Sequence, residues 1–236
     1  MRIAAVADLH CAVGDRERIR ERLNALAAGA AELLLLAGDL TNYGRPEEME
    51  VLISQLLRLR LPIVSVLGNH DYESGAEAEL QRMLREVGIQ ALDGEAYERD
   101  GVGFAGAKGF CGGFGRGELT AFGEAAIKSF VHTAMEESLR LERALSQLRS
   151  ERRVVLVHYA PVAATAEGEA RELFPFLGSS RLSDVCDRFA ATAIFHGHAH
   201  HGTLEGRTRG GIPVYNVALP LLQAQRPPQA FRLVEV

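Results

Sequence analysis

The sequence contains five short stretches with histidine, aspartate or asparagine, side chains that bind metal ions, and each stretch follows a short apolar run. They are Asp8-Leu9-His10, Gly38-Asp39, Gly68-Asn69-His70-Asp71, His158 and His196-Gly197-His198-Ala199-His200. We predict each apolar run to be a β-strand. Ligand sites in open α/β sheets gather outside the carboxyl ends of the strands. The five stretches therefore predict one shared metal site.

The spacing of these residues suits metal ligation. Asp8 and His10 are two residues apart, and so are His198 and His200. Side chains two residues apart in an extended chain point to the same side, so each pair can reach a common ion. Asp39 adds a carboxylate, whose two oxygens can bridge two cations.

Glycines stand immediately before two of these residues. Gly38 precedes Asp39 and Gly68 precedes Asn69, where the chain has to turn sharply. Glycine permits such turns because it lacks Cβ. The candidate ligand set contains four histidines, two aspartates and one asparagine. Imidazole and oxygen ligands together suit Mn, Fe, Zn or Ni better than Ca or Mg.

In this order, the five stretches resemble the calcineurin-like metallophosphoesterase superfamily, and within it the group of bacterial phosphodiesterases. The resemblance spans nearly the whole chain and rests on the set rather than on any one stretch. It implies two divalent transition-metal ions, with Mn²⁺ favoured and Fe, Zn or Ni as alternatives. It assigns one ion to Asp8, His10, Asp39 and His200, and the other to Asp39, Asn69, His158 and His198. Asp39 would bridge the two.

The resemblance also implies a mechanism. Two cations about 3.5–4 Å apart can share a hydroxide that attacks phosphorus in line with the leaving oxygen. His70, which is not a ligand in the resembled family, would donate a proton to the leaving alkoxide or stabilise the equatorial oxygens. Asp71 is placed to orient His70. We therefore expect His70 and Asp71 to be the catalytic residues, and we expect no covalent phosphoenzyme.

Several functions remain open within this resemblance. Phosphoprotein phosphatases carry Gly-Asp-x-x-Asp-Arg-Gly and Gly-Asn-His-Glu, whereas this chain has Asn42-Tyr43-Gly44 in the first motif and Asp71 in the second. We favour a phosphodiesterase that acts on a small nucleotide-type substrate. A general phosphomonoesterase or a nuclease is the alternative among enzymes. A metal-bound protein-interaction scaffold is the alternative outside them, although such scaffolds tend to lose ligands that are all present here.

Composition narrows the choice of partners. The 236 residues carry a formal net charge of −5, which disfavours a surface for extended nucleic acid because such surfaces are basic. No apolar stretch approaches membrane-spanning length, and the N-terminal apolar run is interrupted by Asp8. Three cysteines without a CxxC spacing favour the reducing cytoplasm. We expect a small phosphorylated substrate, no membrane partner and a cytoplasmic location.

Apolar patterning predicts an α/β fold formed by a single domain over residues 1–236. The first part alternates strands at 2–7, 33–37 and 63–67 with helices at 16–28, 46–59 and 74–87, where Asp15 and Ser74 cap and Gly29 and Gly88 stop two of the helices. A hairpin at 96–99 and 102–106, helices at 122–149 and 183–189 and strands at 154–157 and 193–195 follow. Strands at 203–205, 212–217 and 231–236 complete a second, largely antiparallel group. A four-layer α/β/β/α sandwich of two mixed β-sheets flanked by helices fits best.

Other conspicuous residues receive more ordinary interpretations. The glycine-rich segment 109–117 is a loop, either a substrate lid in which Arg116 reaches phosphate or a plain surface excursion. The G-x-G-x-x-G at 101–106 lies in a hairpin, so it does not predict a dinucleotide site. His196 is expected to support the site or the core. His201 is expected to be exposed or to line the rim of the cleft, and His132 is expected to face solvent or to pack. Cys11 is expected to be a small buried residue.

Overall fold

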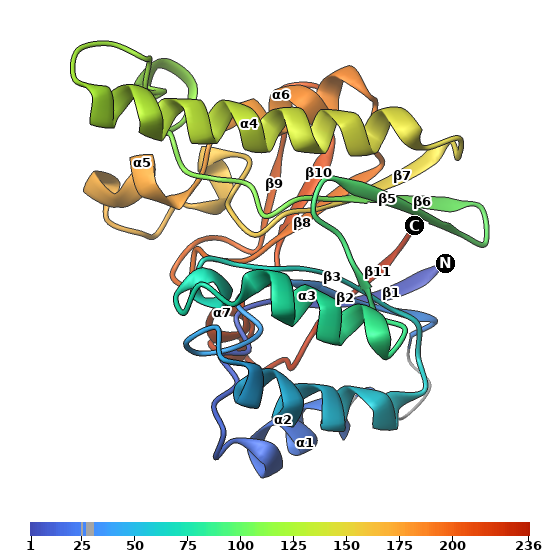
Figure 1. The fold of residues 1–236 in the computed structure, drawn as a ribbon. Helices are drawn as coiled ribbons and strands as arrows, with labels where there is room; N and C mark the ends of the chain where they lie inside the picture. The colour runs from blue at the N-terminus through green and yellow to red at the C-terminus, as the bar shows by residue number, and fades with distance from the viewer. Residues whose placement is uncertain (25, 27–30) are drawn as a thin grey trace.

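Two mixed β-sheets pack face to face, and helices cover the outer face of each sheet, as the ribbon in Figure 1 shows. The computed structural model describes residues 1–24, 26 and 31–236. The layers run helix, sheet, sheet, helix, which confirms the predicted α/β/β/α sandwich.

The first sheet has parallel strands β1 to β4 and one antiparallel strand, β11, at its edge. Its order is β11-β1-β2-β3-β4, with β1 at Arg2–Val6, β2 at Leu33–Ala37, β3 at Ile63–Val66, β4 at Gln90–Ala91 and β11 at Arg232–Glu235. Strands β1, β2 and β3 are apolar because both faces of the sheet are covered. The connecting helices are α1 at Arg16–Asn24, α2 at Pro46–Leu56 with a 3₁₀ turn at Leu57–Leu59, and α3 at Glu77–Glu86.

The second sheet has a parallel centre and antiparallel edges. Its order is β5-β6-β7-β8-β10-β9, with β5 at Glu95–Arg99, β6 at Val102–Gly106, β7 at Arg152–Leu156, β8 at Ala193–His196, β9 at Glu205–Arg207 and β10 at Pro213–Asn216. Only β5 and β9 run antiparallel to their neighbours. Helices α4 at Ala125–Gln147 and α6 at Ser180–Arg188 pack together over its outer face (Figure 1).

The last three predicted strands exist, but their predicted grouping is wrong. Strand β10 runs parallel to β8, and only β9 is antiparallel to it. Strand β11 belongs to the first sheet, where it pairs with β1. The chain end lies beside the chain start, because the N-terminal ammonium donates to the carbonyl oxygen of Val236 at 2.7 Å. This pairing depends on residues more than two hundred positions apart, which local patterning cannot anticipate.

One predicted helix cap is wrong. The Ser74 hydroxyl donates to the carbonyl oxygen of Gly44, and α3 begins three residues later with Ala76 as its N-cap. Asp15 lies directly before α1 as predicted, and its carbonyl oxygen accepts from the N–H of Ile19 at 2.9 Å. The Asp15 carboxylate accepts from the backbone N–H of Ala12 and pairs with Arg18. Helix α4 begins at Ala125 rather than at 122, and α6 begins at Ser180 rather than at 183. The predicted end of the first helix at 28, with its stop at Gly29, lies outside the described residues.

The apolar core lies between the sheets and beneath the helices. Phe104 and Phe195 of the second sheet are fully buried together with Ile3 and Leu35 of the first. A second cluster fills the space under α4 and α6. Within the described residues, no helix combines the length and the apolar character that crossing a membrane requires.

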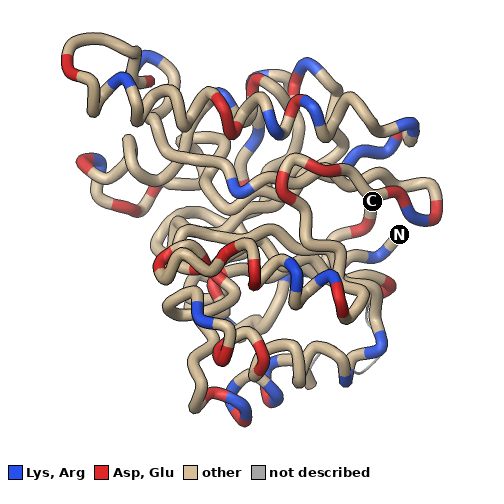
Figure 2. Tube along the Cα trace, viewed as in Figure 1, with Lys and Arg blue, Asp and Glu red and all other residues tan. Residues whose placement is uncertain are grey.

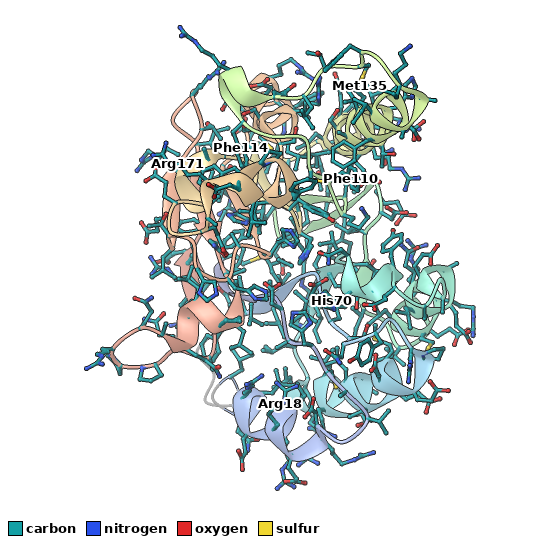
Figure 3. All side chains as sticks on the ribbon, turned by 90° about the vertical axis from the view of Figure 1, so that its left-hand side faces the viewer. Arg18, His70, Phe110, Phe114, Met135 and Arg171 are labelled. Carbon is teal, nitrogen blue, oxygen red and sulfur yellow. The ribbon has the colours of Figure 1, made fainter. Side chains whose placement is uncertain are left out.

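The parallel strands of both sheets end at the same side of the molecule. In Figure 1 this is the left-hand side, and Figure 3 turns it toward the viewer, with His70 between the two layers. The loops that follow β1, β2, β3, β7 and β8 therefore meet at this edge. They carry all of the residues that the sequence singles out for metal binding.

Candidate metal centre

The structure brings the predicted site residues together at this edge. The ligand atoms of Asp8, His10 and His200 all lie within 4.8 Å of one another, and the same holds for Asp39, His158 and His198. The first group belongs to one predicted ion site, and the second group belongs to the other. A third group joins His10, Asp39 and His70, so the two halves are continuous.

Asp8 organises the first half of the cluster. Its carboxylate is 2% exposed, and its Oδ1 lies 3.0 Å from Nε2 of His200. Both carboxylate oxygens also accept from the backbone N–H of His198, at 3.2 and 3.0 Å. The carboxylate after β1 is thereby fixed against the loop after β8.

His158 organises the second half. Its Nδ1 lies 2.9 Å from the carbonyl oxygen of Ala37, so Nδ1 carries a proton and donates it to that oxygen. The other nitrogen, Nε2, faces Asn69 Oδ1 at 2.9 Å and Asp39 Oδ1 at 3.3 Å. In a neutral ring this nitrogen presents a lone pair to two oxygens, an arrangement that a cation between them stabilises.

Asp39 stands between the two halves. Its Oδ1 faces His158, while its Oδ2 lies 3.7 Å from Nε2 of His10. Oδ1 also accepts from the backbone N–H of His70 at 2.9 Å. Each oxygen of this single carboxylate therefore faces a different group of histidines, which is the geometry that a bridging ligand requires.

The buried charges are balanced within the cluster. Burial opposes ionisation of Asp39, but the charge of His158 and the hydrogen bonds from His158 and His70 hold its pKa well below the usual range. Burial likewise opposes the charge on His158, but Asp39 outweighs it and raises the pKa of His158 to about 9. Burial and the neighbouring charge of His158 lower the pKa of His198 to about 4. Without a cation in the site, the His158 imidazolium is the main compensation for Asp39.

Several observations show that this donor set fits a metal ion. Nε2 of His10 is buried and has no hydrogen-bond partner among the described residues, although it points at the cluster. Burial lowers the pKa of His10, so its ring stays neutral and keeps a lone pair for ligation. The donors are imidazole nitrogens, carboxylates and an amide oxygen, a mixture that suits first-row transition metals. The assignment of each residue to an ion stays a prediction.

Four of the seven predicted ligands have an unusual backbone conformation. The angle φ is 58° at Asp8, 43° at His10, 49° at Asp39 and 70° at His198. This left-handed region costs a non-glycine residue of the order of 1–3 kcal/mol, and such strain clusters at functional sites. Backbone hydrogen bonds between the two loops hold it, from Asp8 to Gly38 and from His10 to Asp39, both at 3.0 Å.

Glycine is needed here mainly because the loops approach closely. A Cβ on Gly68 would lie 2.1 Å from Oδ1 of Asp39, and a Cβ on Gly197 would lie 2.4 Å from Oδ2 of Asp8. The predicted sharp turn is present at Gly38, where φ is +88°. Gly68 has no positive φ, and its role is to leave room for the Asp39 carboxylate.

The predicted contact between Asp71 and His70 is wrong. Asp71 is fully buried and accepts from the backbone N–H of Leu40, Thr41 and Gly68 at 3.1, 2.8 and 2.8 Å. The Thr41 hydroxyl adds a fourth hydrogen bond at 2.6 Å. Asp71 therefore ties the loop after β2 to the loop after β3, and it positions Asp39 rather than His70.

His70 is held by a different group. Its Nδ1 lies 2.9 Å from the carbonyl oxygen of Asn42 and 3.8 Å from a carboxylate oxygen of Glu73. Its ring stands edge-on to that of His10, with 4.5 Å between centroids, and its side chain is 37% exposed. The ring therefore borders the candidate ligands and remains accessible.

The remaining sequence candidates lie elsewhere. Arg116 is exposed on a 3₁₀ turn at Gly115–Gly117, and its proposed contact with phosphate stays a prediction. His196 is fully buried, with hydrogen bonds at 2.8 Å to Gly197 and to Thr165, so it supports the loop after β8. His201 and His132 are exposed and Cys11 is buried, as expected.

The aromatic residues next to the cluster were not predicted from the sequence. The Tyr159 ring lies 4.5 Å from that of His198, and the carbonyl oxygen of Phe176 lies 3.3 Å from Nε2 of His198. The Lys108 ammonium lies 5.0–5.3 Å from the ring centroids of Tyr72, Phe110 and Tyr159. The only local sequence signal was the position of Tyr159 directly after His158, because the other partners come from distant segments.

The model of the calcineurin-like phosphoesterase family matches residues 1–202, which include all of the clustered side chains. The chain belongs to this family. The family is one of metal-dependent phosphoester hydrolases, so the Asp and His groups described above form the kind of metal site that is typical of its members.

Solved structures show the same fold at low sequence identity. Phosphopantetheinyl hydrolase (PptH) from Mycobacterium tuberculosis superposes with a TM-score of 0.68 at 16% identity, covering 98% of this chain and 95% of that one. The protein TT1561 from Thermus thermophilus gives 0.61 at 16% identity, covering 99% and 97%. A putative 5′-nucleotidase from Staphylococcus aureus gives 0.52 at 15% identity, covering 91% of this chain and 48% of its own. Comparison with curated proteins gives no match.

The Asp71 network generates a first prediction. In Asp71→Ala, three buried backbone N–H groups lose their acceptor, and each unsatisfied donor costs about 1–3 kcal/mol. We expect the free energy of unfolding, measured by urea denaturation, to fall by about 3 kcal/mol or more. A variant with normal stability but low turnover would instead favour the original assignment of Asp71 to His70.

The close approach at Gly68 generates a second prediction. In Gly68→Ala the added methyl group displaces Asp39, and disturbed ligand positioning typically weakens metal affinity by roughly tenfold or more. Equilibrium dialysis with Mn²⁺ measures the effect. Gly117→Ala is the matched control, because nothing lies within 4 Å of its Cβ position. Equal Mn²⁺ affinity in the two variants would refute the steric argument.

Proposed function

We propose that this chain is a phosphodiesterase that hydrolyses a small nucleotide-type substrate by direct, in-line attack of water on phosphorus. The observation that carries the proposal is the position of Asp39, whose two carboxylate oxygens face two different groups of ligand side chains. His70 borders both groups and is accessible from outside. This arrangement suits phosphoester hydrolysis better than simple metal storage, because an accessible histidine, His70, would lie beside the ions and could act as an acid.

The contacts support a division of the ligand side chains between two ions. Asp8, His10, Asp39 and His200 would hold one ion, and Asp39, Asn69, His158 and His198 would hold the other. Two divalent ions, with Mn²⁺ favoured, supply an activated water and positive charge for the attacking and leaving oxygens. Hydrogen bonds to the carbonyl oxygens of Ala37 and Phe176 orient the rings of His158 and His198.

His70 is proposed to act on the leaving group. The Asn42 carbonyl oxygen accepts from Nδ1 and leaves Nε2 free to face the substrate. A ring protonated at both nitrogens donates from Nε2 to the leaving oxygen or to an equatorial oxygen of the phosphate. Glu73, at 3.8 Å from Nδ1, complements the charge of such a ring.

The charge distribution supports a small substrate. Lys and Arg are interspersed with Asp and Glu along the chain in Figure 2, and no continuous basic face is visible in that view. The formal net charge is −5. Extended nucleic acid requires several phosphate contacts with basic side chains. Two similar structures are named as a phosphopantetheinyl hydrolase and a putative 5′-nucleotidase, and these names are compatible with a small phosphorylated group.

Hydrolysis of bis-p-nitrophenyl phosphate tests the proposal. We expect turnover with added Mn²⁺ and none after chelation, because the activated water depends on the ions. Asp39→Ala should abolish turnover, whereas Asp184→Ala, which removes an exposed carboxylate on α6, should not change it. Two bound ions with no turnover of any monoester or diester would favour a non-catalytic scaffold. A strong preference for monoesters would favour a phosphomonoesterase.

Substitution of His70 tests its role separately from metal binding. In His70→Ala we expect kcat to fall about 10²- to 10⁴-fold, the usual contribution of a general acid, while Mn²⁺ content stays normal. His132→Ala is the control, because this histidine is 71% exposed on α4. Unchanged kcat in His70→Ala would remove His70 from the mechanism without affecting the metal assignment.

A further inference from the structure

A continuous row of aromatic rings leads from the metal centre to the surface. The Tyr159 ring lies 4.5 Å from His198, Phe110 lies 5.8 Å from Tyr159, and Phe130 lies 5.2 Å from Phe110, as measured between ring centroids. Phe176 follows at 6.4 Å from Phe130. We call Tyr159, Phe110, Phe130 and Phe176 the aromatic wall. It comes from four separate segments, and Figure 3 shows Phe110 above His70 on the face toward which the strand ends point.

Phe176 is the outermost ring of this wall and is held beside the site. Phe176 is 56% exposed, so its ring is accessible from outside. Its backbone contacts the site, because its carbonyl oxygen lies 3.3 Å from Nε2 of His198. The next residue, Leu177, is buried, and the carbonyl oxygen of Gly178 accepts from the N–H of Gly113 at 2.8 Å. The backbone of the residue that carries this exposed ring therefore lies next to a candidate metal ligand.

The chemistry of the wall indicates a flat, uncharged occupant. Lys108 is the cation nearest to the wall that the described contacts identify, and it is already engaged by three aromatic rings and by the carbonyl oxygen of Gly109 at 2.9 Å. A second phosphate group would thus find no free positive charge among these described contacts. Flat rings, in contrast, stack on aromatic side chains.

We propose that the aromatic wall, through Phe176, stacks the nucleobase of the substrate while the phosphodiester lies at the metal centre. This inference rests on the proposed function and adds the part of the substrate that is recognised. The wall consists of rings and offers no array of donors and acceptors that could read a base edge. Stacking tolerates every base, so the site selects nucleosides as a class rather than one base.

Three p-nitrophenyl phosphodiesters with the same leaving group test the proposal. They are the thymidine 5′ ester, the methyl ester and the n-hexyl ester. In the Mn²⁺-loaded protein, kcat/KM for the thymidine ester should exceed that for the methyl ester by roughly tenfold or more, the usual effect of one stacked base. The hexyl ester should gain less. A hexyl ester preferred as strongly as the thymidine ester would overturn a nucleobase site in favour of a general apolar site.

Variants assign the selectivity to Phe176. In Phe176→Ala the ratio of the thymidine to the methyl ester should fall by roughly tenfold, and Phe176→Tyr should restore it because the ring is retained. Phe122→Ala is the matched control, since Phe122 is 63% exposed and forms none of the ring pairs of the wall. A ratio that is the same in Phe176→Ala and in the wild type would overturn the proposal.

A binding measurement separates failure of this inference from failure of the proposed function. Calorimetry with the Mn²⁺-loaded protein compares thymidine 5′-phosphate with methyl phosphate. Tighter binding of the nucleotide, lost in Phe176→Ala and kept in Phe176→Tyr, supports the stacking site even if no diester is hydrolysed. Equal binding of the two ligands would overturn the stacking site even if every diester is hydrolysed.

Discussion

The structure depends on one buried carboxylate, that of Asp39, which must be compensated on both of its oxygens. A buried charge is costly unless it is paired and hydrogen-bonded. Here one oxygen faces His158 and accepts from the N–H of His70, while the other faces His10. The surrounding loops meet this requirement. Gly68 leaves space for the Asp39 carboxylate, and Asp71 connects the loop after β2 to the loop after β3 through hydrogen bonds.

The loops around Asp39 adopt strained backbone conformations. Four of the predicted ligands adopt left-handed conformations that only a rigid surrounding structure can maintain. Parallel strands buried on both faces provide this rigidity, because their loops leave a fixed edge with little freedom. The strained conformations point the side chains inward at one place. Fold and site are thus linked through the same short turns, and this explains why the strand ends rather than the helices carry the chemistry.

Much of the site could be predicted because its signals are local. The predicted ligands follow apolar runs, and the rule that sites gather at strand ends places them together without knowledge of the loops. The parts that were missed are non-local. Asp71 accepts hydrogen bonds from a loop thirty residues earlier in the chain. Strand β11 pairs with the first strand, and the aromatic wall combines rings from four distant segments. Positive φ at Asp8 and His10 also depends on a neighbouring loop, and residue type alone gives no sign of it.

In the proposed function, Asp39 joins two ion sites into one centre. Titration of the metal-free protein with Mn²⁺, followed by electron paramagnetic resonance and elemental analysis, tests it most directly. We expect two Mn²⁺ per chain with an exchange-coupled spectrum, and loss of the coupling in Asp39→Ala. A single bound ion, or two ions with the spectra of isolated Mn²⁺, would contradict it.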